Sequence, residues 1–272
     1  MAIDTPAKIA IIGAGPVGLE AALYARFLGY EIEVFERGEV AERFRNSNDP
    51  MSTTFEENST ALALAAMEAQ GGYEPPGSDT TLASADFADH YLLPLSQTDL
   101  LRGEIRTQCE VLRVEQVDDN QTFDSIDGLS GIDSEDPDED EVDRPTLSIH
   151  FREADGTEGS VSAHVVVDAS GRNDASNSVD LSFLQTLGIS CCERTGTFLG
   201  SASQFDATRE QLTTPANLIT CVPNFYVLGS KSFGWGFDFY LRDGHEQIRS
   251  LFSIIGDRVD LDLYQSIRPL GG

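Results

Sequence analysis

The stretch that decides the fold is Lys8-Ile-Ala-Ile-Ile-Gly-Ala-Gly-Pro-Val-Gly18, which is followed by an apolar run and then by Glu31-Ile-Glu-Val-Phe-Glu36. Its first five residues are almost all apolar and end at a glycine, which predicts a strand buried on both faces. The Ala- and Leu-rich residues from Pro16 to Leu28 predict a helix that Gly29 ends. Glu31 to Phe35 predicts a second strand, so the chain opens with a β-α-β unit.

The glycines of this unit have the spacing of a dinucleotide-binding turn. Gly13, Gly15 and Gly18 form GxGxxG between the strand and the helix, where they allow a tight turn, an approach of phosphate to the backbone and close helix packing. The helix amino terminus then faces the phosphates. Glu36 lies eighteen residues after Gly18, where its carboxylate can accept ribose hydroxyls and would repel a 2′-phosphate. The motif suits FAD and NAD alike and disfavours NADP.

Farther along the chain, periodicity predicts a mixture of helices and strands. The expected helices are 60–70, 84–93 and 96–102, the last two separated by Pro94, then 182–187 and 245–255, and the expected strands are 105–117, 146–152, 159–167 and 224–228. Asp155-Gly156 marks a hairpin turn between two of these strands. The fold class that we expect is α/β: an FAD/NAD(P)-binding, Rossmann-like parallel sheet with an inserted antiparallel β-meander from about Thr107 to Ala163.

Three segments resemble the two-dinucleotide-binding-domain FAD flavoproteins, the superfamily of glutathione reductase and the flavin monooxygenases. Gly13 to Glu36 is similar to their FAD fingerprint, and Val165-Val-Val-Asp-Ala-Ser-Gly171 resembles their second motif, an apolar strand that ends in Ala-Thr-Gly. Asn224 to Gly229 resembles their late strand, and the stretch after it looks like the tail of lysine/ornithine N-monooxygenase-like oxidoreductases.

This resemblance implies FAD as the cofactor. The late-strand glycine would lie beside the ribityl–pyrophosphate chain, and the segment Thr107 to Val114 would supply backbone contacts to adenine, which maps best to Val111. The expected cofactor-binding residues are Gly13, Gly15, Pro16, Gly18, Glu36, Arg37, Val111, Gly171, Gly229 and Ser230. No catalytic acid or base is assigned, because the flavin itself carries out the redox chemistry.

One departure from the superfamily pattern bears on function. Between Gly171 and Asn224 no second GxGxxG follows a strand, although such proteins usually insert an NAD(P)H domain there and a βαβ unit needs about 30 residues. The expected function is therefore an FAD-dependent oxidoreductase, monooxygenase-like, with an unknown substrate. The alternative is a non-catalytic FAD-binding protein, or a flavin subunit that a protein partner reduces.

Charge is the unusual bulk property of this 272-residue chain. Asp and Glu number 46 against 18 Lys and Arg, for a net charge of −28, and Lys8 and Lys231 are the two lysines. Such a surface repels phosphate backbones and anionic lipid, which disfavours nucleic acid and membrane as partners. The pattern resembles halophilic proteins, whose repulsion salt screens. The alternative is an ordinary acidic protein with one acidic loop.

Part of the acidity is concentrated in one segment. Asp118 to Asp143 holds twelve acidic residues and no basic one, which is too little apolar content to form a core. We expect residues 118–145 to be a flexible, solvated loop within one FAD-binding domain that spans residues 1–272.

The remaining candidates predict no further site. The four histidines are scattered and the four cysteines form no CxxC pair, so neither a metal site nor a dithiol centre is expected. Cys191 and Cys192 are adjacent, and a redox role for them stays open. No apolar run reaches the roughly 18 residues of a membrane span, and the first apolar stretch lacks the basic start of a signal peptide. We therefore expect a cytoplasmic protein.

Overall fold

The computed structural model describes residues 3–117, 146–171, 213, 218–220, 222–232 and 238–266. Four features from the sequence analysis fall outside these ranges: the acidic segment, the predicted helix 182–187, Cys191 with Cys192, and the interval in which an NAD(P)H domain would be inserted. For those features the expectations above stay predictions.

The central element is a parallel sheet of five strands in the order β3-β2-β1-β7-β8. The strands are β1 (Lys8–Ile12), β2 (Glu31–Phe35), β3 (Ile105–Arg106), β7 (Val165–Asp168) and β8 (Phe225–Val227). β7 and β8 are buried throughout, and so is β1 after its first residue. This burial explains their nearly unbroken apolar sequences, since parallel strands are covered on both faces.

The second sheet is an antiparallel meander in the order β4-β5-β6. It consists of β4 (Cys109–Gln116), β5 (Leu147–Glu153) and β6 (Glu158–Ala163), with the predicted Asp155-Gly156 turn between the last two. β5 buries Leu147, Ile149 and Phe151 and turns the residues between them outward, as expected for a sheet with one covered face. The α/β fold class with an inserted meander is confirmed.

Two predicted strands, residues 105–117 and 159–167, are wrong as single elements, because each is divided between the two sheets. Residues 158–163 form β6 of the meander, whereas residues 165–168 form β7 of the parallel sheet. Ile105 and Arg106 pair with β2 in the parallel sheet, whereas the strand from Cys109 onward belongs to the meander. Gln108 separates them with a left-handed φ of 55°, which a non-glycine residue adopts rarely and at a bend. Alternation of apolar residues continues across this bend, so periodicity alone could not show that the chain changes sheets.

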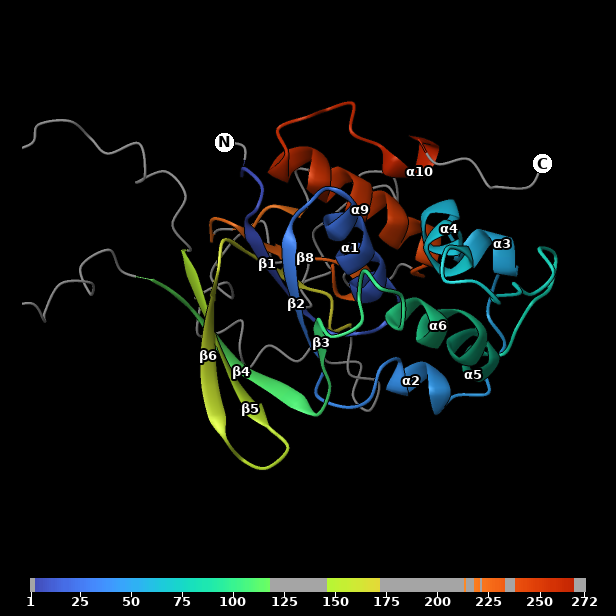
Figure 1. Ribbon diagram of the computed structural model, residues 1–272, viewed down its shortest axis with the longest axis horizontal. Helices are drawn as coiled ribbons and strands as arrows, with labels where there is room; N and C mark the ends of the chain where they lie inside the picture. Colours follow the sequence, from blue (N-terminus) through green and yellow to red (C-terminus); the bar gives the residue numbers. More distant parts are fainter. Residues whose placement is uncertain are drawn as a thin grey trace, which may run out of the picture.

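The two sheets and the helices form three layers (Figure 1). Helices α1 (Pro16–Phe27) and α9 (Leu241–Ile255) cover one face of the parallel sheet, where Ile9, Ile11 and Val167 join their apolar core. The meander covers the other face, where Ala10, Phe35 and Val166 pack against its buried side chains. Strands β1, β7 and β8 therefore contribute alternate residues to two separate cores.

Short helices extend the layer that α1 and α9 form. They are α2 (Glu42–Arg45), α3 (Phe55–Asn58), α4 (Ala61–Glu68), α5 (Ser84–Phe87), the π-turn η1 (Ala88–Leu92), α6 (Leu93–Ser96), the 3₁₀ turn η8 (Gly229–Lys231) and α10 (Leu263–Ser266). The predicted break at Pro94 is wrong, because helical turns run from Ser84 to Ser96. Pro94 has no N–H to donate within this run, and the carbonyl of His90, four residues earlier, accepts a hydrogen bond from Tyr73 Oη at 3.0 Å. Helix α9 also begins at Leu241, four residues earlier than predicted.

Candidate dinucleotide-binding site

The predicted site residues gather at the carboxyl edge of the parallel sheet. Gly13 follows β1, Glu36 follows β2, Gly171 lies three residues after β7, and Gly229 lies two residues after β8. The chain leaves β1 for β2 on one side, while β7 lies on the other side of β1. Between β1 and β7 the sheet thus has a topological switch point, where open α/β sheets bind their ligands.

The structure explains differently why glycine stands at each of the three fingerprint positions. Gly13 has a φ of 104°, and a Cβ there would lie 2.8 Å from Ser170 Cα, so only glycine fits. A Cβ at Gly18 would collide with the carbonyl oxygen of Gly13. A Cβ at Gly15 would meet nothing within 4 Å. Packing therefore does not require glycine at position 15, and this open space fits the role of a backbone that a phosphate approaches.

The helix amino terminus completes this turn. α1 starts at Pro16, directly after Gly15, with no side chain capping it. The first N–H groups of a helix lack partners within the helix, and together with the helix dipole they favour an anion. The arrangement is that of a diphosphate-binding turn.

Glu36 has a second role that the sequence did not indicate. Its Oε2 accepts a hydrogen bond from the Ala14 amide at 2.8 Å, and its Oε1 accepts one from the Gly38 amide at 2.9 Å. The carboxylate thus holds the fingerprint turn to the end of β2. Each carboxylate oxygen has two lone pairs, so both oxygens retain the capacity to accept a ribose hydroxyl. Arg37 follows it as an exposed residue.

Arg43 is a further candidate site residue that the sequence analysis did not include. A Cβ placed on Gly171, whose φ is 73°, would lie 3.9 Å from Arg43 Nη1 and 3.9 Å from Ser230 Oγ. The amide of Ala41, which precedes α2, donates to the Ala14 carbonyl at 3.1 Å and so fixes this helix beside the fingerprint turn. Arg43 therefore brings a cation to the carboxyl edge. The arginine-rich composition of this stretch was the only signal for it.

Gly229 connects the site to α9. Its amide donates to Oε1 of the buried Gln247 at 2.8 Å, and Ser232 Oγ donates to the Gly229 carbonyl at 2.7 Å. With a φ of 76°, Gly229 lies beside Val17 in the first turn of α1. The late-strand glycine is thus held in a left-handed turn against the helix that begins at the fingerprint.

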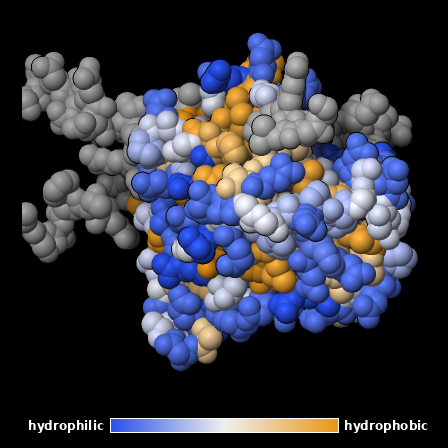
Figure 2. Space-filling model, turned by 45° about the vertical axis from the view of Figure 1, so that its right-hand side comes forward, coloured by the Kyte–Doolittle hydropathy of each residue, from blue (hydrophilic) through white to orange (hydrophobic). Residues whose placement is uncertain are grey.

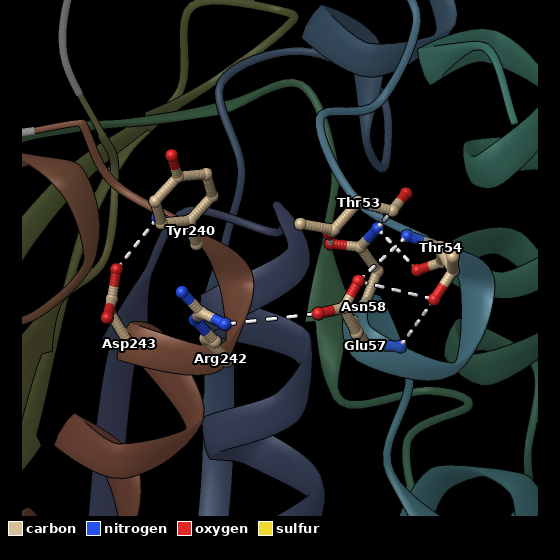
Figure 3. A network of polar contacts seen from close by, with 7 residues as sticks. All are labelled: Thr53, Thr54, Glu57, Asn58, Tyr240, Arg242 and Asp243. Atoms are coloured by element: carbon tan, nitrogen blue, oxygen red, sulfur yellow. Dashed lines mark hydrogen bonds and ion pairs between the residues drawn. The ribbon is translucent and has the colours of Figure 1, made fainter. Parts of the chain in front are cut away.

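The start of α9 is tied to the segment around α3 (Figure 3). The Tyr240 amide donates to Asp243 Oδ2 at 2.9 Å, and Arg242 points across to Glu57, with 3.9 Å between Nη1 and Oε1. Thr54 and Glu57 form a capping box that starts α3. The Arg242–Glu57 pair is exposed, and such pairs stabilise little. The pair shows that the start of α9 lies beside α3, but it is not part of the candidate binding site.

Among the predicted site residues, Val111 differs because its side chain faces a hydrophobic core. Its side chain packs against the core between the two sheets, and its partner across the ladder is Phe151. Two residues earlier, the Cys109 amide donates to the Glu36 carbonyl at 2.9 Å, and the Gln108 amide donates to that of Gly38 at 2.9 Å. The start of β4 therefore lies beside Glu36, and a contact between Val111 and adenine stays a prediction.

Metal-binding groups, membrane spans and hollows in the described ranges are further features that bear on function. Within them, no group of three His, Cys, Asp or Glu side chains is placed to hold a metal ion. None of the helices in the described ranges is both long and apolar enough to cross a membrane. A hollow of about 430 Å³ lies along the edge of β2, but its lining includes Lys8, Glu33 and Arg106. Lys8 and Arg106 each form an ion pair with Glu33.

Comparisons with known proteins agree with this geometry. The family model described as "Pyridine nucleotide-disulphide oxidoreductase" matches residues 8–63, which contain the fingerprint and Glu36. The bacillithiol disulfide reductase Bdr (YpdA) from Bacillus cereus has a similar fold, with a TM-score of 0.57 at 10% identity over 93% of this chain and 99% of that one. No curated protein matches.

Matches to two further solved structures are weaker. The chain is similar to OTEMO, solved with FAD and NADP, at 15% identity and a TM-score of 0.41, over 64% of this chain and 27% of that one. S-allyl-L-cysteine S-oxygenase from Allium sativum gives 18% identity and a TM-score of 0.37, over 61% of this chain and 36% of that one. The chain thus spans about a third or less of the length of these two proteins. The likeness to the Bacillus cereus reductase shows a common fold, and that fold is Rossmann-like.

Proposed function

We propose that this chain is an FAD-dependent oxidoreductase. The main observation behind this proposal is that four strands end around the amino terminus of helix α1. The Gly13–Gly18 turn follows β1 and Glu36 follows β2, while Gly171 and Gly229 arrive from β7 and β8 in left-handed turns. The match of residues 8–63 to a pyridine nucleotide-disulphide oxidoreductase family supports it.

The choice of FAD over NAD rests on the two later turns. An adenosine diphosphate half needs only the fingerprint and the ribose carboxylate. Gly171 and Gly229 have no side chains, so the ends of β7 and β8 leave room for a ligand beside the fingerprint turn. Both glycines also belong to the segments that resemble the second and late FAD motifs. FAD would supply the redox chemistry when bound. The residues of this chain would bind and orient it: Glu36 at the ribose, and the fingerprint turn with Arg43 at the diphosphate.

The finer proposal is a monooxygenase-like enzyme that acts on a small molecule. The rival function is a flavin subunit that a protein partner reduces, or a non-catalytic FAD protein. One sequence observation favours the rival: no second GxGxxG follows a strand between Gly171 and Asn224. In both cases the dense negative charge favours a salt-rich cytoplasm, and it disfavours nucleic acid and membrane as partners.

Two measurements test this proposal. The visible absorption of the purified protein reports bound flavin directly, and we expect an oxidised flavin spectrum. Purified protein that stays colourless after incubation with FAD would contradict FAD binding. Oxidation of NADH or NADPH under air then separates the two functions: turnover by the chain alone supports the enzyme, and turnover only with an added reductase supports the partner-reduced subunit.

A further inference from the structure

A fully buried ion pair lies directly behind the fingerprint turn. Lys231, the last residue of η8, and Asp168, the last residue of β7, are both 0% exposed. Lys231 Nζ donates to Asp168 Oδ2 at 2.7 Å and to Ser170 Oγ at 2.7 Å. Ser170 in turn donates to Asp168 Oδ1 from its hydroxyl at 2.6 Å and from its amide at 3.0 Å.

The composition of the chain makes this lysine unusual. Lys8 and Lys231 are the two lysines among 18 basic residues, and all the others are arginines. A lysine places a compact point charge at the end of a narrow stem, whereas the guanidinium of arginine is broad and planar. A charge removed from water is costly unless it is paired and hydrogen-bonded. The cluster meets this condition, since Asp168 receives three of these hydrogen bonds.

The cluster touches the candidate site through Ser170. The backbone of Ser170 lies so close to Gly13 that a Cβ on that glycine would lie 2.8 Å from Ser170 Cα. Gly171 comes next, beside Arg43 and Ser230. The Leu228 amide donates to the Asp168 carbonyl at 2.8 Å, so the end of β8 is fixed to the same point. The position of the 169–171 turn against the fingerprint turn therefore depends on this cluster.

We propose that Lys231 is a positioning residue for dinucleotide binding. It neutralises Asp168, and through Ser170 it holds the 169–171 turn against the Gly13 turn, so that a diphosphate can bind at the carboxyl edge. Without Lys231 a buried carboxylate three residues before Gly171 would oppose an anionic ligand. The inference rests on the proposed FAD function and extends it to a residue that touches no ligand.

The test is a titration of the apoprotein with FAD, with the melting temperature of each apoprotein measured in parallel. Lys231→Met keeps the length of the side chain and removes its charge, and we expect it to raise the Kd for FAD about tenfold or more. Lys231→Met combined with Asp168→Asn removes both charges and should recover most of the lost affinity. Lys8→Met is the matched control, because Lys8 lies at the opposite end of β1, and it should leave the Kd unchanged.

Three outcomes overturn the proposal. A Lys231→Met protein with wild-type affinity and only a lower melting temperature would show a purely structural role. A double variant as weak as the single one would show that Lys231 does not act through Asp168. If Lys231→Met does not fold, Ser170→Ala tests the same chain of contacts, and an unchanged Kd in that variant would overturn the proposal. Wild-type protein that does not bind FAD would instead contradict the proposed function itself.

Discussion

At the scale of single residues, Glu36 holds the fingerprint turn through two backbone hydrogen bonds, and we propose that it also binds the ribose. Glu36→Arg removes the ribose acceptor and both backbone hydrogen bonds to Ala14 and Gly38. Hydrogen bonds to a charged group contribute about 1.5–3 kcal/mol each, so we expect the Kd for FAD to rise at least about thirtyfold. Flavin content after purification and a direct FAD titration measure this. Glu31→Gln, at the exposed start of the same strand, is the control, and equal flavin content in both variants would refute the assignment.

Glu20 gives a prediction about pH and stability. It is buried in α1, where it accepts a hydrogen bond from Thr60 Oγ1 at 2.6 Å and one from Tyr91 Oη at 3.4 Å. Burial raises the pKa of Glu20 from 4.5 to about 7, against the opposite effect of these hydrogen bonds. The folded state therefore keeps a proton that the unfolded state loses. This stabilisation is fully present below pH 4.5 and is lost as the pH rises through 7.

Glu20→Gln isolates this contribution, because an amide does not titrate. The free energy of unfolding of the wild type, relative to the variant, should fall by about 3 kcal/mol between pH 4.5 and 7. His245 has the opposite sign, since burial lowers its pKa to about 4, but it is common to both proteins and cancels in the difference. Urea denaturation at several pH values measures this difference. Parallel pH profiles would contradict the prediction.

At the scale of elements, the contact between α1 and α9 depends on one glycine. A Cβ at Gly244 would lie 2.8 Å from Val17 Cγ2 and 3.1 Å from Phe239 Cζ. Gly244→Ala should therefore destabilise the protein by about 1–3 kcal/mol through overpacking, and it should weaken FAD binding because Val17 lies in the first turn of α1. Val17→Ala in the same chain should restore part of the stability, and thermal melts of the single and double variants test this coupling. Additive losses would show that the two residues do not share this contact.

The elements also show how far the sequence predicts the structure. The first βαβ unit and the hairpin around Asp155 were predictable, because each rests on a local pattern. The turn at Gln108 and the continuous helix through Pro94 were not, since both depend on tertiary packing that overrides the local signal. The same holds in the site. The spacing of the GxGxxG motif predicted Gly13 and Glu36. Arg43 and Lys231 belong to no such motif and come near the candidate site only in the folded structure.

At the scale of the whole molecule, charge density gives the broadest prediction. On the face shown in Figure 2, hydrophilic residues cover most of the described surface, with smaller apolar areas between them. A net charge of −28 on one chain is self-repulsive, and the Debye length shrinks from about 10 Å at 0.1 M salt to about 3 Å at 1 M. We expect the melting temperature to rise steadily into the molar range of KCl.

Deleting residues 124–143 separates the two explanations of the acidity. Their composition cannot form a core, so the shortened chain should still fold and bind flavin. If the acidic surface as a whole responds to salt, its melting temperature should still rise with KCl. A deleted protein whose melting temperature does not change with salt would show that the acidity is local and that the halophilic interpretation is wrong.

The measurement that tests the central claim most directly is a calorimetric titration of the apoprotein with FAD, NAD⁺ and FMN under identical conditions. We propose that the adenosine diphosphate half of FAD binds at Glu36 and the fingerprint turn, and that the flavin half is needed for full affinity. It therefore predicts one FAD site per chain, with NAD⁺ binding at least about tenfold more weakly and FMN more weakly still. FMN that binds as tightly as FAD, or NAD⁺ that binds more tightly than FAD, would contradict it.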